Sequence, residues 1–178
     1  SIVRNENVEG PLVITSTNPA TEKEIATVSA LDADGAVDAV AAAREAFPGW
    51  ARTPVEERQR LIGRWLQIML EEKDDLARLV SMEGGKPVTE AQLVDVFPGL
   101  ETLSYYSENL TDLLAFKRVK PRQLMFAHWE AGYRFDPLGV LAVITPWNYP
   151  VGIPMAEIVP AVGAGNTVVF KPASATVL

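Results

Sequence analysis

The sequence predicts an α/β fold in which an N-terminal helical region precedes a β-α-β unit. Two short apolar runs, 140–144 and 167–170, flank a helical segment at 152–164, and such runs are typical of strands buried on both faces of a parallel sheet. Parallel strands in such a unit are connected by a right-handed crossover. The 178 residues are 48% hydrophobic, which is enough to bury a core.

The N-terminal part predicts a strand pair followed by a helix. Two strands and the turn between them are expected at 12–17, 24–28 and 18–21. The helix that follows is capped by Asp32 or Asp34 and reaches about Phe47. Pro48 and Gly49 are expected to stop it there, because proline lacks a backbone donor and glycine favours turns.

A capping box predicts the start of the next helix. The Thr53 side chain can accept from the amide three residues on, and Glu56 can reach back, so a helix is expected from this point to Met69. The charged run 71–75 interrupts the apolar stripe and predicts a bend or boundary. A further helical run then ends at Gly84-Gly85, which has the composition of a helix C-cap.

The helical pattern that spans 88–115 must kink or divide at Pro98-Gly99, because proline removes a backbone donor. After it the hydrophobic period changes to that of strands. A hairpin is expected from 124–130 and 133–137, with its turn at Ala131-Gly132.

Composition excludes several classes of function. The chain carries 16 Lys+Arg against 23 Asp+Glu, so the basic cluster at 117–122 is interpreted as solvated and no nucleic-acid partner is expected. No apolar run approaches the length of a membrane span, and residues 1–10 lack the apolar segment of a signal peptide. No cysteine and a single histidine predict neither disulfides nor a metal site, and fit a cytoplasmic location.

Candidate binding residues follow each strand of the predicted β-α-β unit. Ligands of parallel α/β sheets bind beyond the carboxyl ends of the strands, which places the segments 145–150 and 171–174 together. Asn148 is a neutral amide donor held between prolines and suits a developing oxyanion, whereas Lys171 suits a ribose hydroxyl or a phosphate. The residues alone leave an alternative open, in which Trp147 packs, Asn148 shapes a turn and Lys171 is solvated.

Several short motifs run collinearly along the chain. They are Asn18-Pro19-Ala20-Thr21, the stretch 43–50, Glu83 to Pro87, Asp136-Pro137-Leu138-Gly139-Val140, Pro146-Trp147-Asn148-Tyr149-Pro150, Val159-Pro160-Ala161, and Gly165-Asn166-Thr167-Val168-Val169-Phe170-Lys171-Pro172. In order and spacing they resemble the aldehyde dehydrogenase superfamily. The resemblance covers nearly the whole chain from Asn18 and is specific because the motifs agree together.

The resemblance implies oxidation of an aldehyde to a carboxylic acid with NAD or NADP as hydride acceptor. In the family a cysteine thiolate attacks the aldehyde, hydride passes to the nicotinamide, and a glutamate activates water to hydrolyse the thioester. By this match the side-chain amide of Asn148 stabilises the oxyanion. The match also assigns the cofactor lining to Ile144, Thr145, Pro146 and Trp147, a ribose contact to Lys171, and the substrate pocket to Tyr149 and Ile153.

The resemblance also implies how the chain is organised. Residues 1–117 correspond to the strands and helices of the cofactor-binding domain, and 118–136 to a β-hairpin of the oligomerisation type. Residues 137–178 correspond to the start of a Rossmann-like NAD(P)-binding sheet. The small-molecule partner is an aldehyde, and the complete protein is expected to be a homo-oligomer, a dimer or a tetramer.

Two positions depart from the family pattern. NAD-preferring members often carry a glutamate where this chain has Ser174, and a carboxylate there would repel the 2′-phosphate of NADP. Ser174 can instead donate to that phosphate, so NADP is expected to be accepted. Many members have a lysine where this chain has Glu157, so a proton-relay role of that lysine does not carry over.

The catalytic cysteine and the general-base segment of the family have no match in these 178 residues. The segment Glu83-Gly84-Gly85-Lys86 resembles the general-base segment only superficially, because it lacks a leucine and lies at a helix end. We therefore expect an N-terminal portion of the enzyme that is inactive by itself. The alternative is a non-catalytic binding or assembly module that keeps this part of the fold.

Overall fold

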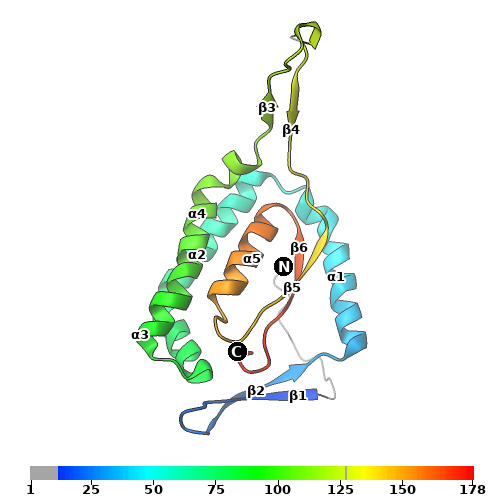
Figure 1. Cartoon of the computed structure of the whole chain (residues 1–178). Coiled ribbons are helices and arrows are strands. Elements are labelled where there is room, and N and C mark those ends of the chain that lie inside the picture. Colours follow the sequence, from blue (N-terminus) through cyan, green and yellow to red (C-terminus); the bar gives the residue numbers. More distant parts are fainter. Residues whose placement is uncertain (1–11, 127) are drawn as a thin grey trace.

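A computed structural model describes residues 12–126 and 128–178 (Figure 1). The first eleven residues, on which the signal-peptide prediction rests, lie outside the described residues. The elements in chain order are β1 (Leu12–Thr17), β2 (Glu24–Ala30), α1 (Ala33–Ala51), α2 (Val55–Gly84), α3 (Val88–Ala91), the π-helix η1 (Gln92–Val96), α4 (Phe97–Leu114), β3 (Lys117–Val119), the 3₁₀ helix η2 (Leu124–Phe126), β4 (Ala131–Tyr133), β5 (Val140–Ile144), α5 (Gly152–Gly163) and β6 (Thr167–Lys171).

The predicted β-α-β unit is confirmed. β5 and β6 pair in parallel, from Val140 opposite Thr167 to Ile144 opposite Lys171. α5 covers one face of this pair and α1 lies against the other (Figure 1). The prediction that these strands are buried on both faces is wrong. In β5 only Val143 is buried, whereas Ala142 and Ile144 are exposed, and no residue of β6 is fully buried.

The core lies between α2, α4 and α5. Its buried side chains include Ile62, Met69, Leu103, Leu110 and Val159. Gly99 permits the close approach of the three helices: a Cβ at this position would lie 3.0 Å from Met69 Cε and 3.2 Å from Met155 Cγ. The apolar faces of the long helices therefore pack against one another rather than against the strands.

The helix boundaries differ from the prediction in two places. α1 continues through Pro48-Gly49 to Ala51, because a proline so near the helix end removes only one hydrogen bond. α2 runs unbroken across 71–75: all five of these charged residues are exposed, and the buried positions resume at Ala77 after Met69. The caps at Asp32, which accepts from Gly35 N at 2.8 Å, and at Gly85, with φ 71°, are confirmed.

The capping box at Thr53 is not formed. Thr53 Oγ1 donates to Gly49 O at 3.2 Å, and α2 begins after Pro54 without a side-chain cap. Farther on, the pattern at 88–115 does divide, but the irregular turn is η1 rather than Pro98-Gly99. Pro98 lies in the first turn of α4, where a missing N–H costs little.

The hairpin forms with a different pairing from the one predicted. β3 pairs with β4, with Arg118 opposite Gly132, and η2 lies near the tip of the arm. Gly132 belongs to a strand instead of the turn. This strand position requires glycine, because a Cβ there would overlap the Lys117 carbonyl oxygen and the Phe116 ring. The predicted strand 124–130 also includes Ala127, which lies outside the described residues.

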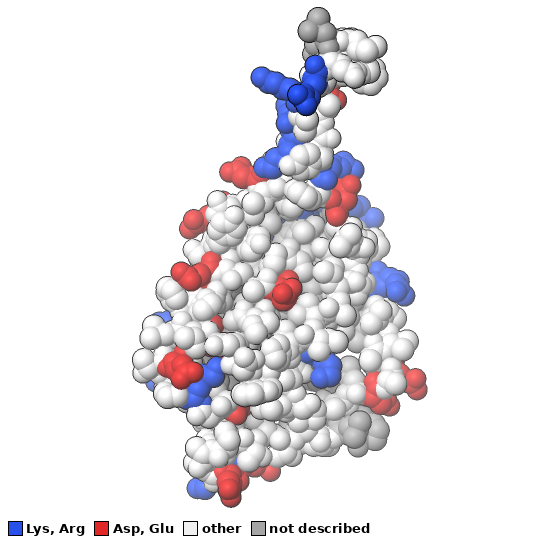
Figure 2. Space-filling model, viewed as in Figure 1, with Lys and Arg blue, Asp and Glu red and all other residues white. Residues whose placement is uncertain are grey.

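The hairpin projects from the helices as an arm (Figure 1), and lysine and arginine side chains gather along it (Figure 2). Two of its arginines are paired: Arg118 with Glu130 at 2.8 Å and Arg134 with Asp136 at 3.1 Å. Across residues 12–126 and 128–178, no helix has the length and apolar character needed to cross a membrane.

Candidate functional site

The predicted site residues follow the carboxyl ends of β5 and β6. Ile144 and Lys171 are the last residues of the two strands and face each other in the pairing. β6 thus extends one residue farther than the predicted 167–170, and Lys171 lies at its end instead of after it. Thr145 N donates to Lys171 O at 3.4 Å, which continues the pairing by one residue into the loop after β5.

The loop after β5 presents exposed side chains on a restrained backbone. Thr145 is buried, but Pro146 and Asn148 are exposed, and Trp147 is 59% exposed. Thr176 Oγ1 donates to Trp147 O at 3.5 Å, so the segments that follow β5 and β6 touch. Within the described residues no hydrogen bond engages the side-chain amide of Asn148, which leaves its donors available to a ligand.

A buried ion pair beneath this loop was not expected from the sequence. Asp95 in η1 is fully buried, and its carboxylate accepts from Lys86 Nζ at 3.2 Å. Asp95 Oδ1 also accepts from Val151 N at 3.0 Å and Gly152 N at 2.6 Å. Lys86 Nζ in turn donates to Asn148 O at 2.6 Å. The pair holds the loop that carries the predicted oxyanion donor.

A second buried carboxylate holds the segment that follows β6. Glu83 accepts from Ser16 Oγ at 2.6 Å, from Val177 N at 3.1 Å and from Leu178 N at 3.2 Å. It lies in the last turn of α2, within the segment 83–86 that the sequence identified as a C-cap. That interpretation is confirmed at Gly85, but the charged residues on either side of the glycines have further partners.

One feature of the sequence could have indicated Asp95. Asp95 lies next to the buried Val96 and four residues after the buried Ala91, so a carboxylate falls within an apolar helical stripe. Such a residue needs a partner, because an unpaired buried charge is costly. The partners themselves could not be identified from the sequence.

The remaining predicted residues are less constrained. Lys171 Nζ donates to Pro172 O at 3.3 Å, and Ser174 is exposed. The Tyr149 ring lies under the ammonium group of Lys86, 4.8 Å from ring centroid to Nζ. Ile153 is half-buried on α5. These positions surround the carboxyl end of the strand pair, where ligands of parallel sheets bind.

A shallow hollow lies beside α5. It has a volume of about 380 Å³ and is lined by Glu101, Thr102, Tyr105, Tyr106 and Ala156. Four of these residues come from α4, and none of the four was predicted from the sequence as a site residue. Their assignment required knowing that α4 packs against α5.

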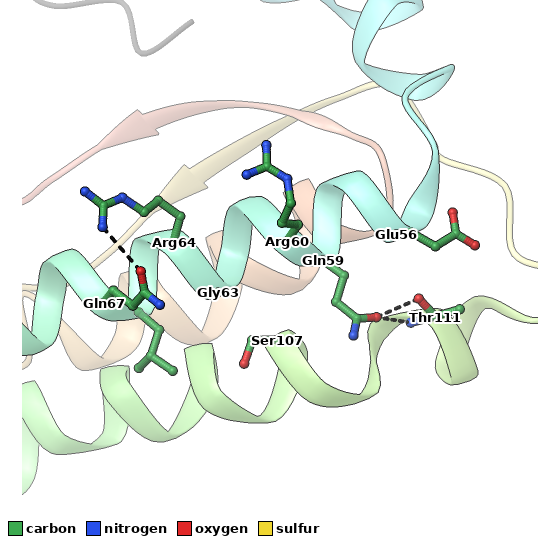
Figure 3. Close-up of a pocket in the computed structure, with 9 residues that line it drawn as sticks. Glu56, Gln59, Arg60, Gly63, Arg64, Gln67, Ser107 and Thr111 are labelled. Carbon is green, nitrogen blue, oxygen red and sulfur yellow. Dashed lines mark hydrogen bonds between the residues drawn. The ribbon is translucent and has the colours of Figure 1, made fainter.

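A second hollow, of about 640 Å³, lies elsewhere, in the seam between α2 and α4 (Figure 3). Gln59 Oε1 accepts there from Thr111 N at 2.9 Å and Thr111 Oγ1 at 2.6 Å, and Gly63 faces Ser107 across the seam. It contains none of the predicted site residues and is a helix-packing groove. Among residues 12–126 and 128–178, no three His, Asp or Glu side chains gather closely enough to hold a metal ion.

Comparison with known proteins gives a consistent result. A family model described as the aldehyde dehydrogenase family matches residues 7–178. A 3-sulfolactaldehyde dehydrogenase from Pseudomonas putida is 37% identical over 162 residues, which make up 91% of this chain and 32% of that protein.

Solved structures agree with the family match. An NADP-dependent enzyme of E. coli is similar with a TM-score of 0.83 and 33% identity, over 93% of this chain and 33% of that one. A mutant aldehyde dehydrogenase C of Pseudomonas syringae, solved with NAD+ and octanal, has a TM-score of 0.79 and 36% identity over 94% and 33%. The chain thus spans about a third of the length of the relatives it matches. It has the N-terminal part of the fold, and it belongs to the aldehyde dehydrogenase family.

Proposed function

We propose that this chain forms part of an enzyme that oxidises an aldehyde to a carboxylic acid with NAD or NADP. Family membership supports the reaction class. The observation that carries the proposal is Asn148, whose side chain is exposed at the carboxyl end of a parallel strand pair while Lys86 holds its main-chain carbonyl. A fixed neutral donor in this place is what stabilisation of an oxyanion requires.

The predicted residues after β5 divide between the aldehyde oxygen and the cofactor. The Asn148 side-chain amide donates to the aldehyde oxygen as negative charge develops on it. Exposed Ile144, Pro146 and Trp147, with the backbone of Thr145, line one wall of the cofactor cleft. When bound, the nicotinamide cofactor supplies the hydride acceptor. Residues at the carboxyl edge of a parallel sheet fit such a ligand.

The substrate side is assigned to Tyr149 and Ile153. Both lie close to the start of α5, and the hollow lined by α4 and Ala156 opens beside that helix. The relatives named above provide aldehydes to test first: octanal, which is bound in the Pseudomonas syringae structure, and 3-sulfolactaldehyde, after which the Pseudomonas putida enzyme is named.

The decisive experiment measures aldehyde-dependent NAD(P)H formation by the full-length protein. Asn148→Ala should lower kcat about 10²- to 10³-fold, the usual effect of removing an oxyanion donor. The 178 residues alone contain no thiol nucleophile, so we propose that they turn over no aldehyde. No turnover by the full-length protein would favour a non-catalytic binding or assembly module instead.

We also propose that NADP is accepted, because Ser174 is exposed and can donate to the 2′-phosphate. The ratio of kcat/KM for NADP and NAD tests this. Ser174→Glu should shift the ratio toward NAD by charge repulsion, with Ser174→Ala as the uncharged control. A strong NAD preference of the unmodified protein would contradict the proposal.

The arm supports a homo-oligomer, either a dimer or a tetramer. Met125, Trp129 and Phe135 on it are 69%, 61% and 60% exposed, and apolar side chains so exposed favour association. Sedimentation of the full-length protein, compared with Trp129→Ser, measures the oligomeric state. A cytoplasmic location, proposed from the cysteine-free composition, is tested by cell fractionation.

A further inference from the structure

We propose that Lys86 and Asp95 are positioning residues that fix the loop of Asn148 and thereby the direction of its amide. The inference rests on the proposed function, since it assigns this ion pair a purpose in the same reaction. It concerns residues of the helical region, outside the segments 145–150 and 171–174 that the sequence singled out.

Asp95 caps α5 from another part of the chain. Val151 at the N-cap of α5 offers no side-chain hydrogen bond, so the first amides of the helix lack a local acceptor. Asp95 Oδ1 supplies one to Val151 N and Gly152 N. Its negative charge also lies at the positive end of the helix dipole. Because Asp95 is fully buried, water does not compete for these bonds.

Lys86 connects this cap to Asn148 itself. Its side chain is 12% exposed, and its ammonium group bonds Asp95 Oδ2 at 3.2 Å and Asn148 O at 2.6 Å. The backbone of Lys86 is fixed in turn, because Ser81 Oγ donates to Lys86 O at 2.7 Å. The Asn148 carbonyl before Tyr149 and the Val151 and Gly152 amides after it thus hydrogen-bond to one buried ion pair.

Asp95 lies in η1, where a π-helical turn replaces the regular helix. Such turns occur often at functional sites, since they redirect a side chain that a regular helix would aim elsewhere. Gly152 completes the approach: a Cβ there would lie 3.3 Å from Asp95 O and 3.4 Å from Asp95 Oδ1. The loop, the π-turn and the end of α2 therefore meet at the ion pair.

Restraint of the backbone is what Asn148 needs. Within the described residues its amide has no partner that would orient it, so its direction depends on how firmly its main chain is held. Displacement of a catalytic donor by about 1 Å can lower a rate on the order of 10²-fold. The ion pair therefore acts through Asn148 and touches no substrate.

The test uses steady-state kinetics of the full-length protein. Lys86→Met keeps the apolar stem and removes the ammonium donor; Asp95→Asn keeps the volume and removes the charge. Each should lower kcat about 10- to 100-fold while KM for the cofactor changes less than about threefold, because the contact that is weakened, from the Asn148 amide to the oxyanion, is made only in the transition state. Lys86→Arg should recover part of kcat. Asp75→Asn, which breaks an exposed ion pair with Arg78 on α2, should change neither.

A double-mutant cycle shows whether the effect passes through Asn148. Once Asn148→Ala has removed the amide, adding Lys86→Met should lower kcat no further. Additive losses, or an unchanged kcat in Lys86→Met, would overturn the inference and leave the proposed function standing.

Amide hydrogen exchange gives a readout that needs no turnover. Peptides covering 148–155 should exchange faster in Lys86→Met than in the unmodified protein, because the loop loses its restraint. Equal exchange would overturn the inference. If the unmodified protein oxidises no aldehyde, the proposed function fails, and the exchange rates still decide whether the ion pair holds the loop.

Discussion

The two ends of the strand pair β5 and β6 are held in different ways. At the amino ends, the buried side chain of Asn166 hydrogen-bonds the backbone. Its Oδ1 accepts from Leu138 N at 2.6 Å and Gly139 N at 3.0 Å, and its Nδ2 donates to Ala161 O at 3.1 Å. At the carboxyl ends the side chains of Ile144 and Trp147 are exposed instead, and the loops are held through their backbone by Glu83, Lys86 and Asp95.

Arg58 extends this buried arrangement at the amino end. Its guanidinium donates to Gly163 O at 2.9 Å and to Thr53 O. Burial lowers the pKa of Arg58 from its ordinary value, and the nearby Glu56 carboxylate opposes that shift. One end of the strand pair is therefore built for stability and the other for exposed side chains on a fixed frame. Substitutions at the two ends should separate stability from activity.

The largest expected loss of stability comes from Asn166→Ala. The substitution removes the buried oxygen that accepts from both Leu138 N and Gly139 N in part-buried hydrogen bonds, which should cost about 2–3 kcal/mol of the free energy of unfolding. Asn166→Asp keeps the acceptor oxygen and should cost less. Urea denaturation of the three proteins measures the difference, and an unchanged midpoint in Asn166→Ala would contradict the assignment of this end as the stabilising one.

Gly165→Ala should have the next largest effect. Gly165 follows α5 with φ 95°, a backbone conformation that side chains disfavour, so alanine should destabilise the protein by about 1–2 kcal/mol. Gly49 is a matched control, because it is helical and a Cβ there meets nothing within 4 Å. Gly49→Ala should stabilise by up to about 1 kcal/mol. Thermal unfolding would refute the comparison if both variants shifted in the same direction.

Trp50→Phe should weaken the attachment of α1 to this end. Trp50 Nε1 donates to Val162 O at 2.9 Å, and phenylalanine keeps an aromatic ring but loses the donor. The expected cost is about 1 kcal/mol, the net value of one such hydrogen bond. Denaturation measures it, and kcat of the full-length protein should stay unchanged, because Val162 lies at the far end of α5 from Asn148.

The features that the sequence predicted correctly have partners nearby in the chain. Asn18 forms its turn with Ala20 N and Thr21 N, and Gly85 ends α2 by bonding back to Ser81 O. Periodicity and turn chemistry report such contacts because they span only a few residues. The β-α-β unit was predictable for the same reason.

The features that were missed depend on distant partners. Lys86 meets Asn148 across 62 positions, and Glu83 meets Val177 across 94. The hairpin register depends on how closely Gly132 approaches the Phe116 ring, which no turn signal encodes. The sequence therefore predicted that the loops after β5 and β6 lie together, but not which residues hold them in place.

The smallest expected effect on stability, and the clearest separation of the two ends, is at Ile144. Because Ile144 is mostly exposed, Ile144→Ser should change the free energy of unfolding by no more than about 0.5 kcal/mol. The same change one residue earlier, at buried Val143, should cost about 2 kcal/mol, since it loses apolar burial and places a hydroxyl in the core. If Ile144 lines the cofactor cleft, Ile144→Ser should raise KM for NAD(P) several-fold at unchanged stability. A stability loss equal to that of Val143→Ser would mean that Ile144 contributes to the core as Val143 does, and would contradict the comparison of the two ends.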